Sequence, residues 1–388
     1  MKEGWKMVKL GEVCEIQNGY AFDSKCFSSE SEMPLIRIRD IKRGYTETFY
    51  DGDYSSEYIV RKGDFLIGMD GEFNIGEWNS EDALLNQRVC KLIPNNKINV
   101  RFVYYYIPES LKRIESKTSF ATVKHLSSKQ IKEIDIPLPP LEEQHRIVSI
   151  LDASFEKIDA LKKNAEENLK NAKALFQQVL AQELKPKEGW VEKKLAEIVT
   201  ENCSLSYGIV QPGDDVQNGI PVVRPVDFSN DIFVKREGLK RTKKEISDAY
   251  QRTILTGNEI LMCVRGTTGT MGFATDELKG CNVTRGIVPI LIDRTSVKRF
   301  VYYQLLSPLL QKQIAENTNG TALKQINIKD LRVLKLFMPS LEEQHRIVQT
   351  LDTLSEKCRR LEEVAQQTIR ECDALKQSIL RQAFSGEL

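Results

Sequence analysis

Two kinds of hydrophobic pattern alternate along the chain, and each occurs twice. Residues 141–184 and 341–384 contain neither proline nor glycine, and their apolar side chains recur in steps of three and four. Such spacing is typical of a heptad seam on a long amphipathic helix. The predicted seam residues are Leu151, Phe155, Ile158, Leu161, Ala165, Leu169, Ala172, Phe176 and Val179 in the first stretch, and Leu351, Leu354, Cys358, Leu361, Ala365, Thr368, Cys372, Leu375 and Ile379 in the second. We therefore predict two long helices.

Local signals mark the start of each predicted helix. Pro139 and Pro140 precede the first, and before the second Ser340 is placed as an N-cap with Glu343 at the capping-box position. A helix of about 44 residues is about 66 Å long at about 1.5 Å per residue, and it cannot bury its apolar stripe alone. A coiled coil between chains is one interpretation. We favour an antiparallel pair within the chain, because two copies related by a pseudo-twofold axis place their helices in opposite directions.

The segments 1–140 and 188–340 have a different pattern. Short apolar or alternating runs, separated by Gly, Asn and Asp, predict strands, and a helical stretch follows them at 100–115 and at 296–316. The predicted fold class is α+β, with two tandem pseudo-twofold-related domains, each followed by a long helix, and the helices paired as an antiparallel coiled coil. The predicted boundaries are 1–140 for the first domain, 141–187 for the first helix and linker, 188–340 for the second domain and 341–388 for the second helix.

An internal repeat relates the two halves. Leu141–Val148 recurs letter for letter as Leu341–Val348, 200 residues later, and the match continues without a gap along the helix. Upstream the offset shrinks, so that Arg37 matches Arg224, and the second copy has gained residues in its interior. The helices thus stay in register while the domains diverge. We interpret the helices as the part that fixes geometry and the domains as the part that recognises a ligand.

Composition and charge leave the kind of ligand open. The chain has 388 residues, and 56 Lys+Arg against 55 Asp+Glu give a formal net charge of +1. This excludes a uniformly basic coat for nucleic acid but not a local basic face. No stretch reaches the roughly 18 apolar residues that span a bilayer, and the N-terminus lacks the apolar run of a signal peptide, so we expect a soluble cytoplasmic protein with no membrane partner. The eight cysteines contain no C-x-x-C pair, and we expect reduced packing thiols.

No motif supports catalysis by this chain alone. Pro139-Pro140-Leu141 lacks the Asp or Asn and the aromatic residue of an adenine methyltransferase motif. Residues 266–272 are glycine-rich, but no G-K-S/T follows them, which favours a turn. Glu277-Leu278-Lys279 after Asp276 matches a metal nuclease pattern that charged chains contain by chance. Three histidines offer little to a metal site or a Ser-His-Asp arrangement, and we expect no catalytic residue, metal or cofactor in this chain.

Basic side chains concentrate in the domains. Residues 235–244 contain six basic residues and one acidic residue, and a second basic cluster surrounds a turn after Arg37. Each cluster could be a solvated loop, but their matching places after Arg37 and Arg224 favour phosphate contacts. Arg88 aligns with Arg285, and Asn, Gln and Arg are the side chains that pair with base edges. A buried arginine that holds a loop is an equal alternative.

The residues now match a known family. The duplicated Leu-Glu-Glu-Gln-His-Arg-Ile-Val at the start of each long helix, a Gly-Trp pair near each domain start and the C-terminal run Ser378–Gly386 closely resemble the specificity subunit of Type I restriction-modification systems. The resemblance spans the whole chain. It implies that each domain is a target recognition domain that reads one half of a bipartite site in double-stranded DNA, and that the helices fix the separation of the half-sites. Because few positions outside framework pairs such as Gly63 and Gly257 are identical, we expect an asymmetric site.

The resemblance also implies partners. Two methyltransferase (M) subunits would carry S-adenosylmethionine and methylate an adenine in each half-site, and two restriction (R) subunits would use ATP and Mg. The repeated helix starts would lie near the M subunits, and the alternative is that their histidines only pack at the joint between domain and helix. The candidate partner-binding residues are Glu142, His145, Arg146, Glu342, His345 and Arg346.

The candidate DNA-binding residues come from both domains. They are Arg37, Arg39, Lys42, Arg43, Asn86, Arg88 and Lys124 in the first, and Arg224, Lys235, Arg236, Lys240, Arg241, Arg265, Asn282, Arg285 and Lys324 in the second. A coiled-coil scaffold without sequence preference is the main alternative function, and it would bind random and cognate DNA alike. A nuclease is a third class, and it would cleave DNA by itself in the presence of Mg²⁺.

Overall fold

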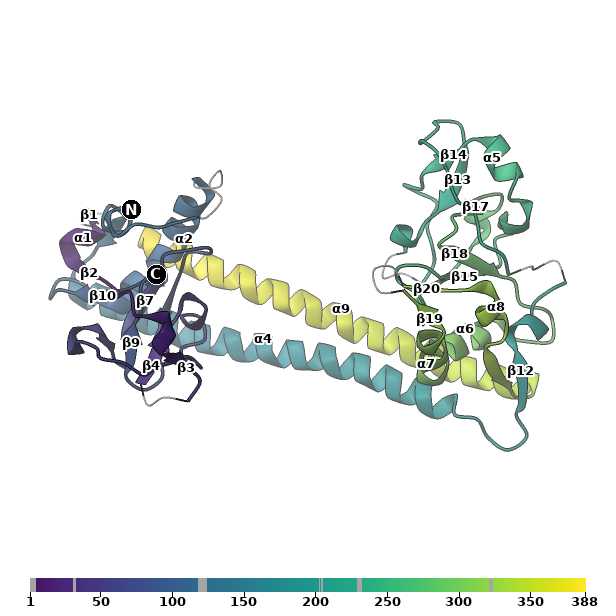
Figure 1. Ribbon diagram of the computed structural model, residues 1–388, viewed down its shortest axis with the longest axis horizontal. Helices are drawn as coiled ribbons and strands as arrows, with labels where there is room; N and C mark the ends of the chain where they lie inside the picture. Colours follow the sequence, from purple (N-terminus) through teal and green to yellow (C-terminus); the bar gives the residue numbers. More distant parts are fainter. Residues whose placement is uncertain are drawn as a thin grey trace. The chain divides into compact units, whose positions relative to one another are not determined.

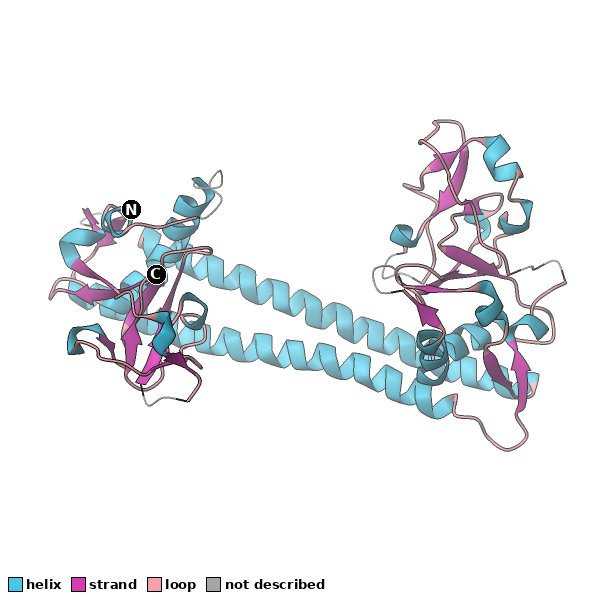
Figure 2. Cartoon of the chain, viewed as in Figure 1, coloured by secondary structure: helices cyan, strands magenta, loops and turns pink. Residues whose placement is uncertain are grey.

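The computed structural model describes residues 5–30, 33–117, 124–201, 203, 205–228, 232–320 and 324–388. The chain forms two compact units, Met1–Ala165 with Gln367–Leu388, and Glu166–Gln366 (Figure 1). Each unit contains one globular domain and a part of both long helices. The strands lie in the globular domains and the two long helices are continuous (Figure 2), which confirms the predicted α+β class.

The long helices are α4 (Leu141–Glu183) and α9 (Leu341–Ser385). Ser340 caps α9, since its Oγ accepts a hydrogen bond from the Glu343 N–H at 3.3 Å. In the first unit Lys162 of α4 pairs with Asp373 of α9 at 2.6 Å, and Asp159 accepts a hydrogen bond from Lys376. Residue numbers rise along α4 from Asp159 to Lys162 while those of their partners in α9 fall from Lys376 to Asp373, so the helices run antiparallel there. In the second unit Arg346, near the start of α9, lies 3.2 Å from Glu183 at the end of α4, which gives the same direction.

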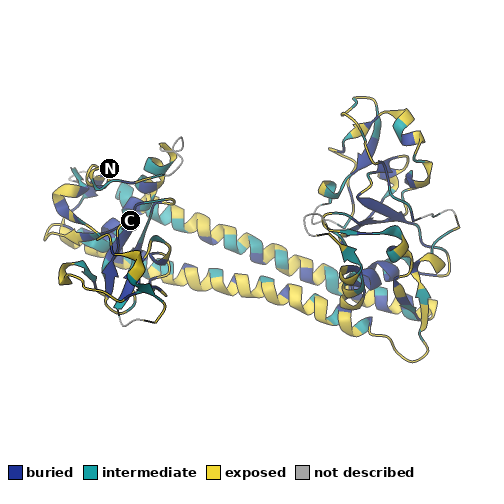
Figure 3. Cartoon of the chain, in the orientation of Figure 1, coloured by how far each residue is buried: buried dark blue, intermediate teal, exposed yellow. Residues whose placement is uncertain are grey.

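The buried seam of the helices is narrower than the predicted one. In the middle of both helices one small or apolar residue per heptad is buried, namely Leu151, Ile158, Ala165 and Ala172 in α4 and Leu351, Cys358, Ala365 and Cys372 in α9. The predicted seam residues Leu161, Leu361 and Leu375 are exposed instead, by 52%, 54% and 49%. Two helices alone bury only a narrow strip of each other, so much of each helix is exposed (Figure 3). Of the helices that the structure describes, none is both long and apolar enough to cross a membrane.

The first domain is built from short strands, 3₁₀ turns and the α-helices α1, α2 and α3, of which α2 has 18 residues. Its elements are β1 (Lys6–Lys9), α1 (Leu10–Val13), β2 (Cys14–Asn18), η1 (Ser24–Cys26), β3 (Phe27–Ser28), β4 (Met33–Ile36), η2 (Ile38–Asp40), β5 (Phe49–Tyr50), η3 (Ser56–Tyr58), β6 (Ile59–Val60), β7 (Phe65–Gly68), β8 (Asn74–Glu77), β9 (Ala83–Leu85), β10 (Val89–Pro94), α2 (Val100–Lys117), α3 (Ser128–Lys132) and β11 (Asp135–Leu138). The strands form a sheet of order β2-β10-β7-β8, a second sheet of order β3-β5-β4-β9-β6, and the pair β1-β11. Phe102 and Ile107 of α2 and Ile147 and Leu151 of α4 belong to one buried core, so the helix start is part of the domain.

The second domain repeats this plan with changes. Its elements are β12 (Val191–Lys194), η4 (Leu195–Glu197), β13 (Ile220–Val223), η5 (Pro225–Asp227), β14 (Arg241–Thr242), α5 (Lys244–Asp248), η6 (Gln251–Thr253), β15 (Ile260–Cys263), β16 (Met271–Phe273), η7 (Asp276–Leu278), β17 (Asn282–Val283), β18 (Ile287–Ile290), α6 (Lys298–Leu306), α7 (Pro308–Glu316), β19 (Thr318–Asn319), β20 (Gln325–Ile326), α8 (Ile328–Arg332) and β21 (Lys335–Met338). The sheets have the orders β14-β13-β17 and β16-β15-β18, and β12 pairs with β21 as β1 pairs with β11. The helix predicted at 296–316 is broken in two, because Ser307 ends α6, caps α7 and is followed by Pro308 at the first position of α7.

Matching ion pairs fix each domain to a long helix. In the first unit the Asp152 carboxylate of α4 accepts hydrogen bonds from Arg101 at 2.9 Å and from the Tyr105 hydroxyl. In the second unit Asp352 of α9 bonds in the same way to Arg299, at 2.7 Å, and to Tyr303. Burial, and then the hydrogen bond to the carboxylate, raise the pKa of both tyrosines, so these hydroxyls stay protonated donors.

A buried glutamine completes each joint. Gln144 and Gln344, the glutamines of the repeated helix start, are at most 1% exposed. Gln144 accepts a hydrogen bond from the Asn99 N–H at 2.8 Å and donates to the Pro139 carbonyl oxygen at 2.8 Å. Gln344 makes the matching bonds to Val297 and Pro339, at 2.8 and 3.0 Å. The repeat therefore encodes, among other things, one way of joining a domain to its helix.

Candidate nucleic-acid interface

In the first unit, four of the predicted contact residues lie around one cavity. Arg37, Arg39, Asn86 and Arg88, together with Gln87, line a space of about 480 Å³. Phe22, Ser24, Phe27 and Ile38 complete the lining, and within the described part of the chain no lining residue is acidic. Three guanidinium groups and two side-chain amides around one hollow can bind phosphate oxygens or base edges.

Parallel strands bring these residues together. β4 and β9 run parallel, with Leu35 beside Leu84 and Ile36 beside Leu85. Arg37 and Asn86 are the next residues along each strand, so they emerge at the same edge of the sheet. The Arg37 N–H donates to Asp40 at 2.9 Å, and this bond starts the 3₁₀ turn η2 that carries Arg39.

A close approach of two segments holds the loop that contains Asn86. A Cβ atom on Gly19 would lie 2.0 Å from the Asn86 carbonyl oxygen, so only glycine fits. The neighbouring Tyr20 donates to the Leu85 carbonyl oxygen at 2.9 Å and accepts from the Gln87 N–H at 2.7 Å. The Asn86 side-chain oxygen also accepts from Gln87, at 2.8 Å. The loop is therefore fixed before any ligand binds.

One residue of this region, Asp70, is absent from the sequence-based candidates. Its carboxylate, 11% exposed, accepts a hydrogen bond from Arg88 and lies 2.6 Å from His125 Nδ1. These partners lie 18 and 55 residues away along the chain. No local spacing joins them, so only the fold reveals the cluster.

The other candidates of the first domain lie outside this cavity. Lys42 pairs with Glu72 at 2.7 Å, and Lys124 pairs with Glu115 at 2.8 Å. The hydrogen bond from Lys124 lowers the pKa of the Glu115 carboxyl. Arg43 is exposed just after η2. These residues suit contacts with the DNA backbone better than base reading, because phosphate contacts need charge and little fixed geometry.

In the second unit the same framework carries different side chains. β13 and β17 run parallel, and Arg224 follows β13 as Arg37 follows β4. Its N–H donates to Asp227 at 2.7 Å, and its guanidinium also binds the Asp227 carboxylate, at 2.7 and 3.1 Å. This hydrogen bond raises the pKa of Arg224. The backbone thus confirms that Arg37 matches Arg224. The two differ in that the Arg224 guanidinium is bonded to Asp227.

The strand register corrects the alignment of Arg88 with Arg285. Val223 pairs with Val283 as Ile36 pairs with Leu85, so Thr284 matches Asn86, Arg285 matches Gln87 and Gly286 matches Arg88. The exposed Arg285 confirms this, since its N–H donates to the Ile209 carbonyl oxygen at 2.8 Å as that of Gln87 donates to Tyr20. The sequence alignment is off by one residue here because it matches the two arginines by identity, and few of the residues around them are identical.

Asn282 is a core residue, which corrects its assignment as a DNA contact. It is fully buried, and its amide nitrogen lies 3.0 Å from the Ser247 hydroxyl. Its oxygen accepts from Thr253 at 2.7 Å and from the Val283 N–H at 2.8 Å. A side chain satisfied on all sides inside the protein has nothing left for a base.

The basic segment after β13 lies at the surface but is partly bonded to main-chain oxygens. Arg236 donates to Glu277 at 2.8 Å, Lys240 to Gly213 at 3.3 Å and Arg241 to Gln217 at 3.4 Å. Lys235 is exposed. The bonds hold the segment while leaving its charge at or near the surface, as expected for phosphate contacts.

Arg265 and Lys324 lie together in the second unit. Arg265 pairs with Gln325 in an isolated bridge, and the Gly266 N–H donates to the Lys324 carbonyl oxygen at 2.9 Å. Lys324 and Gly266 line a hollow of about 310 Å³ with Thr267 and Thr268. The first part of the glycine-rich segment is therefore a turn, as predicted, and residues 271 and 272 begin β16; the turn lies beside two candidate contact residues.

The repeated helix starts present side chains to solvent. Glu142 and His145 are exposed, as are their counterparts Glu342 and His345. The alternative that these histidines pack at the joint is therefore wrong. The two arginines are anchored within their own units instead, because Arg146 bonds to Glu143 and to the Leu388 carbonyl oxygen, the latter at 2.6 Å. Arg346 bonds to Glu183.

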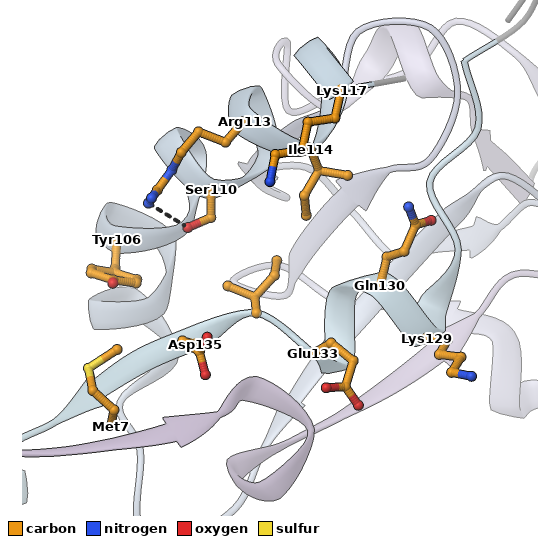
Figure 4. A pocket seen from close by; sticks show the side chains of 11 residues that line it. Met7, Tyr106, Ser110, Arg113, Ile114, Lys117, Lys129, Gln130, Glu133 and Asp135 are labelled. Atoms are coloured by element: carbon orange, nitrogen blue, oxygen red, sulfur yellow. Dashed lines mark hydrogen bonds between the residues drawn. The ribbon is translucent and has the colours of Figure 1, made fainter. Parts of the chain in front are cut away.

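A further hollow of about 670 Å³ lies between α2 and the β11 region (Figure 4). Arg113 and Lys117 face it from α2, and Glu133 and Asp135 from the opposite side (Figure 4). No candidate contact residue lines it. The mixed charges give it no clear preference for an anion, so we do not assign it to DNA. In the described ranges no three His, Cys, Asp or Glu side chains are grouped to hold a metal ion.

Comparisons with known proteins agree on one family. A model of the Type I restriction modification DNA specificity domain matches residues 2–171 and 187–371. The chain is 35% identical over 412 residues to the Type I restriction enzyme EcoBI specificity subunit of Escherichia coli, with 100% of this chain and 86% of the relative covered. It is 25% identical over 420 residues to the putative type I restriction enzyme MjaX specificity subunit of Methanocaldococcus jannaschii, covering 100% and 94%.

Solved structures are similar in fold. A chain of a type I R-M system superposes with a TM-score of 0.72 at 24% identity, covering 100% of this chain and 99% of the other. The HsdS subunit from Thermoanaerobacter tengcongensis gives a TM-score of 0.56 at 23% identity, covering 100% and 98%. At these identities the likeness concerns the fold alone.

Proposed function

Since the chain belongs to the family of type I restriction-modification DNA specificity subunits, we propose that each of its domains reads one half of a bipartite site in double-stranded DNA. One observation carries the proposal. In both units an arginine follows the first of two parallel strands and bonds through its N–H to an aspartate three residues later, Arg37 to Asp40 and Arg224 to Asp227. The framework is thus shared, while the side chains around it differ.

These differences support two unlike half-sites. At the three positions after β9 the first domain has Asn86, Gln87 and Arg88, and at the matching positions after β17 the second has Thr284, Arg285 and Gly286. Asn and Gln suit adenine in the major groove and Arg suits guanine. A change of residue type at a fixed backbone position changes the base that fits, so the site is asymmetric.

The helices are proposed to set the spacing of the half-sites. α4 has 43 residues and α9 has 45, so each is about 65 Å long at about 1.5 Å per residue. A turn of DNA spans about 34–36 Å, and helices of this length suit half-sites about two turns apart. The joints at Asp152 and Asp352 support this role, since a ruler requires each domain to be fixed to its helix.

Two copies of one methyltransferase subunit are the proposed partners on the helices. The exposed Glu142 and His145 recur as Glu342 and His345, although many exposed positions further along the long helices differ, such as Asp159 and Arg359. A surface that is kept identical in both halves of a diverged repeat suits two copies of the same partner. Two restriction subunits would complete the assembly.

Exposed leucines recur in the same way. In the first unit Leu161 and Leu375 fall between the residues of two inter-helix contacts, Lys162 with Asp373 and Asp159 with Lys376. Their repeat counterparts in the second unit are Leu361 and Leu175, and all four are 45–54% exposed. Exposed apolar side chains at matching places support a docking surface for an apolar partner helix in each unit.

The stoichiometry of the purified complex tests the partner proposal. Leu161→Ser with Leu375→Ser removes the apolar pair of the first unit only, and the complex is expected to lose one of two methyltransferase subunits in a native mass measurement. Leu361→Ser with Leu175→Ser is the matched variant and is expected to do the same. Retention of both subunits by both variants would contradict the docking surface. Replacing His145, Arg146, His345 and Arg346 by alanine tests the helix starts, and unchanged complex formation would exclude them.

The chemistry is proposed to reside in the partners. The methyltransferase subunits would bind S-adenosylmethionine, and the restriction subunits would bind ATP and Mg, while this chain contributes the DNA sequence preference. A subunit that reads chromosomal DNA would act in the cytoplasm.

Footprinting of the assembled complex on selected DNA tests the central proposal. The expected result is two short protected segments of different sequence, separated by a spacer without sequence preference. A single continuous short site would contradict the ruler role of the helices. Equal binding to random and selected DNA would favour the scaffold alternative.

A further inference from the structure

Arg88 has an unusual backbone conformation at the rim of the first-domain cavity. Its φ is 69°, and among the described residues Leu205 is the only other non-glycine residue with a positive φ. This left-handed region is unfavourable for a side chain with a Cβ. A residue held there by its surroundings is a candidate for function, because the strain must be offset by the contacts that fix it.

The contacts that fix Arg88 centre on Asp70. One Asp70 oxygen accepts a hydrogen bond from Arg88 Nη1, and the other lies 2.6 Å from His125 Nδ1. The Asp70 side chain is 11% exposed, whereas that of Arg88 is 53% exposed. Both carboxylate oxygens are therefore engaged beneath a guanidinium that reaches solvent.

Main-chain bonds hold the three segments of this cluster in register. The Met69 N–H donates to the Arg88 carbonyl oxygen at 2.9 Å, and the Leu126 N–H donates to the Met69 carbonyl oxygen at 2.6 Å. Asp70 therefore stays beside both Arg88 and His125 without depending on side-chain contacts alone. The cluster is preformed in the absence of DNA.

The second unit keeps these main-chain bonds but exchanges the side chains. The Val264 N–H donates to the Gly286 carbonyl oxygen at 2.8 Å, as that of Met69 does to Arg88. The Ile326 N–H donates to the Val264 carbonyl oxygen at 3.0 Å, as that of Leu126 does to Met69. Arg265 therefore takes the place of Asp70, Gly286 that of Arg88 and Gln325 that of His125. The arginine has moved to the other strand, where its buried Nε has no hydrogen-bond partner among the described residues.

Such an exchange is typical of a recognition surface rather than of structural support. Residues that hold this fold together are repeated, as Asp152 and Asp352 are. The Asp70 and Arg88 pair instead differs between the domains, although the main-chain hydrogen bonds around it are the same. The pair therefore belongs to the part of the domain that is free to vary with the sequence read.

From these contacts we infer that Asp70 is a positioning residue, which holds the Arg88 guanidinium so that it bonds to the base edge at one base pair of the half-site read by the first domain. The inference rests on the proposed function of the domains. A guanidinium has five N–H donors in a fixed fork. With one nitrogen tied to Asp70, the remaining donors are fixed in direction, and two of them can bond to guanine O6 and N7.

Selection from a randomised double-stranded DNA library tests the inference. The full chain, assembled with its methyltransferase partner, is compared with Asp70→Ala, Arg88→Ala and the double variant. Each single variant is expected to lose preference at the same base pair by about 5- to 150-fold, and the double variant is expected to lose no more than Arg88→Ala alone. Asp70→Asn, which keeps one oxygen acceptor, is expected to show a smaller loss.

The half-site read by the second domain provides an internal control for folding. Its preferences are expected to be unchanged in every variant. Asp135→Ala, which removes an exposed acid paired with Lys9 at 2.7 Å, is the matched control and is expected to keep the whole profile.

The outcomes separate the inference from the proposed function. No base preference in the unaltered complex would overturn the proposed function. A normal profile for Asp70→Ala, beside an unaltered complex that does select a site, would overturn only the positioning role. Two other results for Asp70→Ala would also overturn the positioning role. One is an equal loss of base preference in both half-sites. The other is tighter binding to all sequences, which would mean that the Asp70 charge only repels phosphates.

Discussion

The joint between the second domain and α9 provides a prediction whose size follows from the structure. Asp352 accepts hydrogen bonds from Arg299 at 2.7 Å and from Tyr303. Asp352→Ala removes both, and among the described residues Arg299 has no second acidic partner. Asp152→Ala removes the matching bonds in the first unit, but there Arg101 keeps Glu77 at 2.8 Å.

The magnitudes follow from these partners. A hydrogen bond to a charged group contributes about 1.5–3 kcal/mol when buried, and less when exposed. The side chains of Asp352 and Arg299 are 39% and 28% exposed, so two such bonds give about 2–4 kcal/mol for Asp352→Ala. For Asp152→Ala we expect about 1–3 kcal/mol, because Arg101 remains paired and only Tyr105 loses its acceptor.

Tryptophan fluorescence during urea unfolding measures each unit separately. Trp190 is the only one of the three tryptophans in the second unit, while Trp5 and Trp78 lie in the first. The free energy of unfolding of the second unit is read from Trp190 with Trp5 and Trp78 replaced by phenylalanine. The free energy of unfolding of the first unit is read from Trp5 and Trp78 with Trp190 replaced by phenylalanine. If Asp152→Ala cost as much as Asp352→Ala, or if neither cost more than about 0.5 kcal/mol, the account of the joints would be wrong.

Two further predictions concern single side chains. Gly19→Ala places a Cβ 2.0 Å from the Asn86 carbonyl oxygen. In thermal unfolding this substitution is expected to destabilise the first unit by about 1–3 kcal/mol, and in DNA selection it is expected to weaken the preference only for the first-domain half-site. Unchanged stability would contradict the close approach of the two segments. Burial raises the pKa of the Cys90 thiol from 9.0 to about 12, so about one molecule in 10,000 carries the thiolate at pH 8. Iodoacetamide at pH 8 is expected to label the partly exposed Cys26 first and Cys90 only on unfolding, and equal labelling rates would contradict this. The stability that the raised pKa contributes is fully present below about pH 9 and is lost as the pH rises towards about 12, which urea unfolding at increasing pH checks.

The long helices could be predicted because their signals are local. Prolines, a serine cap and apolar spacing placed the helices at 141–184 and 341–384, within one residue of the observed bounds. Which apolar residues are buried was harder to predict. Leu361 and Leu375 fit the heptad spacing, yet they are exposed because a pair of helices buries a strip narrower than the apolar stripe. The break at Pro308 was also missed, although proline after a serine is a known start signal.

The candidate residues of the two domains could be matched to each other only where the repeat kept its residues. Arg37 and Arg224 were matched correctly because identical framework residues surround them. Asn282 was misassigned because burial depends on Ser247 and Thr253, which a sequence pattern does not place beside it. Asp70 could not be found at all, since its partners come from two distant segments. Long-range contacts, rather than local pattern, decide which polar residues remain available for DNA.

Genome-wide mapping of methylated adenines tests the central claim most directly. Cells that carry this chain with its methyltransferase partner are compared with cells that lack only this chain. The account predicts methylation at a bipartite site with two different short half-sites and a spacer of constant length. Methylation within one continuous motif, or the same methylation in cells without the chain, would contradict it.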